Sequence, residues 1–90
     1  MKTLERKFII TRKNGVHTRV AYNLVAMAAE FQSQILLQCG HRQADCSSIL
    51  DILSMAAGCG ACVSIRVQGD DAEEAMDALT DLLDCREEMA

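Results

Sequence analysis

The chain of 90 residues has no proline and no tryptophan, and its aromatic residues are one tyrosine and two phenylalanines. So few rings argue against a surface on which nucleobases stack. They also leave a core that must be built from aliphatic side chains and methionine. The formal net charge is −4 and there is no basic block, which argues against nucleic acid as the main partner.

Long apolar runs are missing as well. No stretch approaches the ~18 residues that span a bilayer. The polar start, Met1 to Lys7, is followed only by Phe8-Ile9-Ile10, which is too short for a signal-peptide core. We therefore expect no membrane insertion and a cytoplasmic location. Half of the residues are hydrophobic, so residues 1–90 are expected to fold as a single domain around one modest core.

Cysteine, by contrast, is plentiful, with five residues. Their odd number and the cytoplasmic expectation favour reduced thiols. Cys59 and Cys62 form a C-x-x-C pair, but this pair leads into a strand and does not start a helix, as redox pairs do. A structural zinc site usually needs four ligands. If the second and fourth strands are antiparallel neighbours, Cys39 approaches Cys62, with His41 nearby. An oxidation-sensitive or metal-scavenging cluster of Cys39, Cys59 and Cys62 is therefore one hypothesis, although no cofactor is otherwise expected.

Hydrophobic periodicity predicts strands and helices in the order βαββαβα. A turn at Gly69-Asp70-Asp71 precedes the last helix, whose inward stripe runs from Ala72 to Leu83, and the residues from Cys85 onward are expected to fray. With no proline-rich breaks, this order indicates an α+β fold, an antiparallel sheet with helices on one face. The other expected elements are strands at 4–11, 33–39, 41–44 and 61–68 and helices at 18–31 and 48–57.

The segment Asn14-Gly15-Val16-His17-Thr18-Arg19 brings one histidine and one arginine to the point where a turn becomes a helix. Gly15 allows the turn. The first backbone N–H groups of a helix attract an anion and disfavour a second positive charge, so a histidine there tends to stay neutral, as a nucleophile must. With the guanidinium of Arg19 and the hydroxyl of Thr18 beside it, His17 is a candidate residue to carry a phosphoryl group on an imidazole nitrogen. The structural alternative is a surface histidine that caps a helix.

The same segment resembles the active site of HPr, the histidine-containing phosphocarrier family of the bacterial sugar phosphotransferase system. A second segment, Ser47-Ser48-Ile49-Leu50-Asp51-Ile52-Leu53-Ser54, resembles the family's serine-led short helix. The resemblance implies an open-faced β-sandwich, with a four-stranded antiparallel sheet in the order 1-4-2-3 and three helices on one face. It further implies roles for individual residues: His17 as the phosphorylated residue, Arg19 as its charge partner, Thr18 and Gly15 as phosphate-binding support, Ser48 as the serine modified by a regulatory kinase, and Leu50 and Leu53 as docking positions.

Three residues depart from the pattern that this resemblance implies. Family members usually have proline where this chain has Val20, and small residues where it has Tyr22. Proline suits the first turn of a helix, so its loss loosens the presentation of Arg19. Asp51 stands where glycine is common, and its carboxylate would repel a phosphate on Ser48. A structural reading of the serine pair is that Ser47 caps the short helix through its hydroxyl.

The resemblance predicts a phosphocarrier that takes a phosphoryl group on His17 from a phosphoenolpyruvate-dependent donor and passes it to sugar-permease acceptors of the IIA type. Such a protein is a phosphoryl-transfer intermediate and has no small-molecule substrate of its own. The expected partners are enzyme I, IIA-type proteins and a serine kinase or phosphorylase, and the expected state is a monomer. The alternative is an HPr-like regulatory module that docks partners and has weak or no carrier activity because of Val20.

Overall fold

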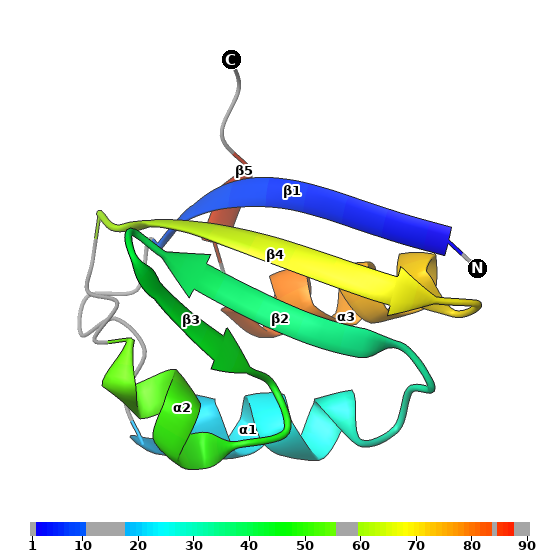
Figure 1. Cartoon of the computed structure of the whole chain (residues 1–90), viewed down its shortest axis with the longest axis horizontal. Coiled ribbons are helices and arrows are strands. Elements are labelled where there is room, and N and C mark those ends of the chain that lie inside the picture. The colour runs from blue at the N-terminus through cyan, green and yellow to red at the C-terminus, as the bar shows by residue number, and fades with distance from the viewer. Residues whose placement is uncertain (1, 11–17, 56–59, 84, 88–90) are drawn as a thin grey trace.

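The sheet and its helices form two layers, with the helices on one side of the sheet (Figure 1). The computed structural model describes residues 2–10, 18–55, 60–83 and 85–87, with the backbone alone at 83 and 85–87. The elements follow the predicted order and add one short strand at the end. They are β1 (Lys2–Ile10), α1 (Thr18–Ala28), β2 (Gln34–Cys39), β3 (Arg42–Asp45), α2 (Ile49–Ser54), β4 (Cys62–Gly69), α3 (Ala72–Leu83) and β5 (Cys85–Glu87).

All strand pairs are antiparallel, and the sheet order is β3-β2-β4-β1-β5. The order 1-4-2-3 that the resemblance implied is therefore confirmed for the first four strands, as are the three helices. β4 lies between β1 and β2: Val63 pairs with Phe8, and Val67 pairs with both Leu4 and Ile35. Partners opposite each other in an antiparallel pair share a face, so these contacts stack apolar side chains across three strands.

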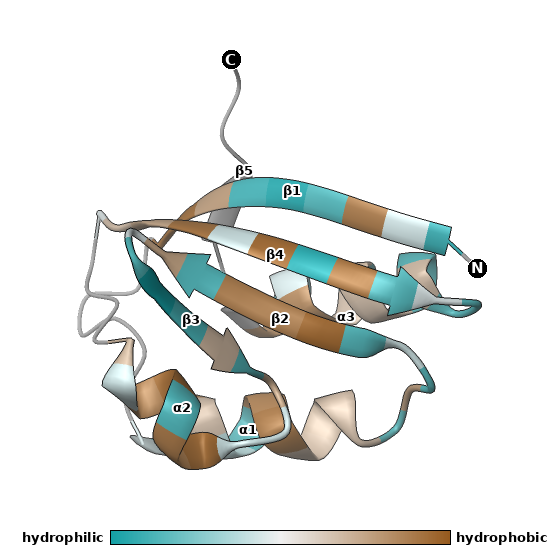
Figure 2. Cartoon of the chain, in the orientation of Figure 1, coloured by the Kyte–Doolittle hydropathy of each residue, from teal (hydrophilic) through white to brown (hydrophobic). Residues whose placement is uncertain are grey.

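The core fills the space between the inner face of the sheet and the helices. Along β4 the side chains alternate between buried and accessible, and Figure 2 shows the matching alternation of hydropathy. α3 supplies much of the other wall, because its inward stripe is fully buried at Ala72, Ala75, Met76 and Leu79. As the lack of rings predicted, aliphatic and methionine side chains dominate this core, and Phe8 is its one buried ring among the described residues.

The prediction that the residues from Cys85 onward fray is wrong for the first three of them. Cys85–Glu87 pairs with Phe8–Ile10 and adds a fifth strand outside β1. The remaining differences are shifts at element ends. α1 stops at Ala28, before a turn and bend that lead to β2, and α2 stops at Ser54 where a helix to residue 57 was predicted.

A carboxylate joins two loops at the end of β4. Asp71 Oδ2 accepts a hydrogen bond from the backbone N–H of Gln32 at 2.8 Å, and Oδ1 accepts from the N–H of Ser33 at 3.0 Å and from the Ser33 hydroxyl. These bonds, led by that of the hydroxyl, lower the pKa of Asp71 below its ordinary value. They fix the connection between α1 and β2 against the start of α3.

Gly69 completes this junction, and its lack of a side chain is required by the space available. Its φ is +155°, and a Cβ built there would lie 2.6 Å from the Cα of Ser33. We expect Gly69→Ala to lower the free energy of unfolding by about 3 kcal/mol, because both the backbone conformation and the overlap with Ser33 oppose the methyl group. Urea denaturation measures this loss.

Gly40→Ala is the matched control for this substitution. Gly40 also has a positive φ, +63°, but no atom lies within 4 Å of the position that its Cβ would take. Its substitution should cost only about 1 kcal/mol, from the backbone alone. Equal losses in the two variants would show that Ser33 is not the obstacle.

The depressed pKa of Asp71 makes the junction sensitive to acid. A carboxyl group whose pKa is lower in the folded than in the unfolded chain stabilises the fold above the unfolded pKa of about 4, and this contribution is lost as the pH falls through the folded pKa. Asp71→Asn should therefore melt at a lower temperature than the wild type at pH 7, and the difference should shrink as the pH falls below about 4. Asp81→Asn on the exposed face of α3 is the control; a constant difference for Asp71→Asn would contradict this account.

Candidate functional site

The first residues of α1 face either the solvent or the core. Thr18 and Arg19 are exposed, whereas Val20 is 4% exposed and lies in the core with Ala21. His17 and Gly15 lie outside the described residues, and in the sequence His17 directly precedes the first residue of α1. Val20, which stands where the resemblance implies proline, therefore packs inward and leaves the neighbouring Arg19 facing solvent.

This end of α1 is suited to hold an anion. The first four backbone N–H groups of a helix have no partner within the helix, and the first turn of α1 contains no acidic residue that would compete for them. Neither of the two ion pairs between described residues involves Arg19; they join Lys2 to Glu73 and Arg66 to Glu5. A guanidinium, a hydroxyl and the helix N–H groups together can bind phosphoryl oxygens.

The second predicted segment forms α2, which packs against α1 (Figure 1). Its N-cap is Ser48, and not Ser47 as the structural reading of the sequence had it. The Ser48 hydroxyl accepts a hydrogen bond from the N–H of Asp51 at 3.2 Å, as an N-cap does. Ser47 instead donates its N–H and its hydroxyl to the Asp45 carboxylate, at 2.9 and 2.8 Å, so its oxygen is not at the helix end.

The two leucines of α2 differ in exposure. Leu50 is 76% exposed, whereas Leu53 is partly buried and packs against the core. The difference arises because Ile52 is fully buried and sets the rotation of the helix. At the other end of α2, Arg42 of β3 donates to the carbonyl oxygen of Ser54 at 2.6 Å, which satisfies one of the last backbone acceptors. Leu50 is thus presented to solvent on a helix fixed at both ends.

The sheet separates Cys39 from Cys62, two of the three cysteines of the predicted cluster. Cys39 lies on the same face as the buried Leu37, whereas Cys62 alternates with the buried Val63 and faces the opposite, outer side. The prediction that the ends of these two strands are neighbours is confirmed. The prediction that Cys39 and Cys62 form a cluster is wrong, because their side chains lie on opposite faces of the sheet. Within the described ranges no group of three metal-ligating side chains occurs, and Cys59 falls outside those ranges.

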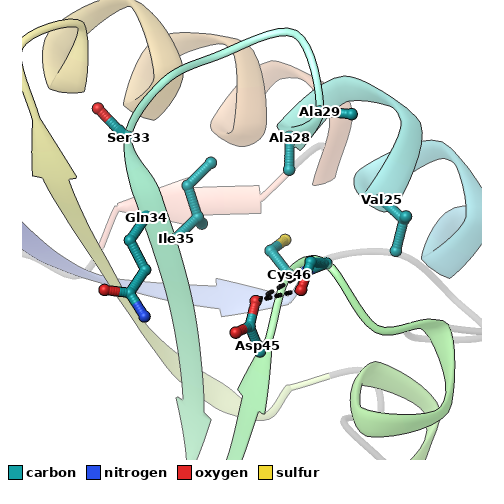
Figure 3. A pocket seen from close by; sticks show the side chains of 9 residues that line it. Val25, Ala28, Ala29, Ser33, Gln34, Ile35, Asp45 and Cys46 are labelled. Atoms are coloured by element: carbon teal, nitrogen blue, oxygen red, sulfur yellow. Dashed lines mark hydrogen bonds between the residues drawn. The ribbon is translucent and has the colours of Figure 1, made fainter.

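A cavity of about 340 Å³ opens at the other end of α1, and its lining is mainly apolar (Figure 3). Cys46 faces it, but this thiol is 1% exposed, and burial, with a smaller effect of the Asp45 charge, raises its pKa to about 12. The thiol therefore stays protonated at neutral pH and is a poor nucleophile. None of the predicted site residues that the structure describes lines the cavity. Its described walls are Val25, Ala28, Ala29, Ser33, Gln34, Ile35, Asp45, Cys46 and Ser47.

Comparison with known proteins matches this arrangement to one family. The family model described as "PTS HPr component phosphorylation site" matches residues 4–84. The chain belongs to the PTS-HPr family. A phosphocarrier protein HPr of Cupriavidus necator is 39% identical over 80 residues, which cover 89% of this chain and 90% of the relative. A phosphocarrier protein NPr of Shewanella violacea is 35% identical over 86 residues, covering 96% and 94%.

Solved structures of PTS-HPr proteins have the same fold. The HPr of Bacillus anthracis superposes with a TM-score of 0.84 at 30% identity, covering 91% of this chain and 98% of that one. An HPr of Thermoanaerobacter tengcongensis gives 0.82 at 36% identity, covering 93% and 92%. Membership of this family implies partners within the phosphotransferase system. No helix in the described part of the chain has the length and apolar character needed to cross a membrane.

Sequence reasoning noted Tyr22 as a departure from the family but did not place it in the site. The structure puts it on the exposed face of α1, with 61% of its surface accessible. The helical periodicity of the sequence could have indicated this position. Val20, Ala21 and Leu24 point inward, and Tyr22, three positions after Arg19, lies on the opposite, solvent-facing side of the helix.

The position of Val20 in the first turn predicts that proline is tolerated there. The N–H of Val20 is among those without an acceptor in the helix, and proline fixes φ near its helical value. We expect Val20→Pro to change the free energy of unfolding by less than about 1 kcal/mol, since lost packing offsets the gain in rigidity. Val25→Pro, in the interior of the same helix, should cost about 3 kcal/mol or more. Chemical denaturation of both variants checks this; equal losses would contradict the position of Val20 in the first turn.

Proposed function

We propose that this protein is a phosphocarrier that accepts a phosphoryl group on His17 and passes it on. The observation that carries the proposal is the exposed pair Thr18 and Arg19 at the N-terminus of α1, directly after His17 in a chain of the PTS-HPr family. The donor is a phosphoenolpyruvate-dependent enzyme I, and the acceptors are IIA-type proteins. The carrier has no small-molecule substrate of its own and works as an intermediate between two proteins.

Transfer needs little from the carrier beyond position and charge. A neutral imidazole nitrogen of His17 attacks the phosphorus in line, the bond from phosphorus to the donor's nitrogen breaks, and the electron pair of that bond stays with the donor. The helix N–H groups, the Thr18 hydroxyl and the Arg19 guanidinium then stabilise the phosphoryl oxygens. Because Arg19 is the only cation in the described first turn of α1, the group is held weakly enough to be passed on. Gly15 is proposed to support phosphate binding together with Thr18.

Docking is proposed to use α2 beside this site. Leu50 is the stronger anchor because its side chain is exposed, and Leu53 contributes from its partly buried position. Both lie on a helix that packs against α1, so a partner that covers the start of α1 also reaches them.

Ser48 is proposed as a regulatory phosphorylation site for a serine kinase and its phosphorylase. Its half-buried hydroxyl already caps α2, and a phosphate at that oxygen would lie at the positive end of the helix. The Asp51 carboxylate in the same first turn repels such a phosphate. Modification of Ser48 should therefore be less favourable here than in a carrier with glycine at that position.

The remaining proposals concern the protein as a whole. Residues 1–90 act as a single domain, the protein is a monomer, and it works in the cytoplasm. The PTS-HPr family model covers residues 4–84, so one family unit accounts for nearly the whole chain. The family's partners, enzyme I and the IIA-type proteins, receive or deliver the phosphoryl group by direct contact.

Phosphotransfer itself tests the function. Incubation with phosphoenolpyruvate and enzyme I should add one acid-labile, alkali-stable phosphoryl group, seen by intact mass, and His17→Ala should abolish it. Val20→Pro should be labelled at least as fast as the wild type, because the fixed φ orders the turn that carries Arg19. Arg19→Gln should slow labelling by roughly 10-fold to 100-fold, because it removes the guanidinium charge that stabilises the phosphoryl oxygens in the transition state.

Labelling that persists in His17→Ala would move the site to another residue. A folded wild-type protein that its own enzyme I does not label would refute the carrier function. If the wild type is labelled slowly and Val20→Pro restores the rate, the carrier function stands and Val20 is the cause of its low efficiency.

A further inference from the structure

Two large apolar side chains are prominently exposed among the described residues, Tyr22 at 61% and Leu50 at 76%. They lie on α1 and α2, which pack against each other. Single exposed apolar residues are common and need no explanation. Here the two belong to adjacent helices, and one of those helices begins at the residue after His17. Tyr22 therefore lies near the end of α1 that follows His17 in the sequence.

The periodicity of α1 places Tyr22 beside Arg19. Residues three apart in a helix are neighbours on its surface and differ by about 4.5 Å along the axis. The inward side of the helix is occupied by Val20, Ala21 and Leu24, so the tyrosine ring cannot turn into the core without displacing them. The ring therefore stands on the solvent side, about one turn beyond the first residue of α1.

A protein that docks over the start of α1 covers this ring. A transient complex at the small end of the range buries up to about 600 Å² on each partner, which corresponds to a disc of roughly 14 Å radius. Tyr22 is four residues after Thr18, about 6 Å along the helix axis. It lies well inside a disc centred on the start of α1. A partner must therefore either receive the ring or be held away by it.

We propose that Tyr22 determines which phosphoryl-donor protein this carrier accepts. The inference rests on the proposed function. The fitting donor has an apolar recess that receives a phenol ring beside its phosphohistidine, flanked by an acidic group that meets Arg19. A donor whose surface is flat at this point cannot close over the start of α1 while the ring is present. Tyr22 thus contributes affinity for the matched donor and excludes others by its bulk.

A comparison of two donors tests this role. One is enzyme I from the same genome, and the other is an enzyme I whose own carrier has alanine at the position of Tyr22. With the first, Tyr22→Ala should raise the KM for the carrier about 10-fold with kcat nearly unchanged, as expected for a lost anchor of a transient interface. With the second, it should lower the KM by about 3-fold to 10-fold, because the obstructing ring is gone.

Two further variants separate the ring from its hydroxyl and from general surface effects. Tyr22→Phe should behave as the wild type with both donors, because the recess receives the ring. Gln68→Ala, an exposed position on the outer face of β4, should change neither KM. Since Tyr22 is exposed on a helix and alanine favours helices, Tyr22→Ala should fold normally, which circular dichroism verifies.

The result that would overturn the inference differs from the one that would overturn the function. If the wild type is labelled by its own enzyme I and Tyr22→Ala has the same KM with both donors, the carrier function stands and Tyr22 has no role in specificity. If Tyr22→Ala lowers kcat and leaves both KM values unchanged, the ring acts on transfer and not on choice of donor, and the inference is wrong. If the wild type is not labelled, the proposed function fails and this inference fails with it.

Discussion

The structure depends above all on the burial of one face of β4. Val63, Ile65 and Val67 are each no more than 1% exposed, and β4 is hydrogen-bonded to β1 on one side and β2 on the other. A strand in this position aligns two neighbours at once, so its register decides which side chains of both enter the core. The helices then cover the same face. Because the side-chain period is two residues, a slip of one residue along β4 would expose the core of the whole sheet.

The same strand explains how much of the fold was readable in the sequence. The alternation of apolar and polar residues along β4 and the apolar stripe of α3 predicted both elements nearly to their ends. Each pattern marks the side chains that the folded structure buries. β5 was not predictable in this way. A three-residue strand has too few positions to show a period, and its pairing with β1 depends on a neighbour more than 70 residues earlier in the chain. The close approach of Gly69 to Ser33 likewise arises only when two loops meet.

The candidate site was predictable to a different extent. The residue types at 17–19 indicated an anion site at a helix start, and the structure confirms that a helix begins at Thr18 with Arg19 exposed. The capping serine was predicted one residue too early, since Ser47 and Ser48 are equivalent in a propensity argument and only the backbone around Asp45 distinguishes them. The helical phase of α1 matters most here. By burying Val20, Ala21 and Leu24, the core itself selects which side chains a partner meets.

The pairing of β1 with β4 also bears on how the chain folds as it is synthesised. β1 is made first, but its partner on the inner side of the sheet, residues Cys62–Gly69, is made about 60 residues later. At the usual rate of roughly 5–20 residues per second, the first strand waits several seconds for its neighbour. During that time α1, the hairpin of β2 and β3, and α2 can form local contacts. β1, whose apolar end is Phe8-Ile9-Ile10, has no native strand to pair with until β4 is made. The charged and polar residues at the start of β1 disfavour wrong pairing of this strand before β4 is made, and the sheet closes only after β4 has been made.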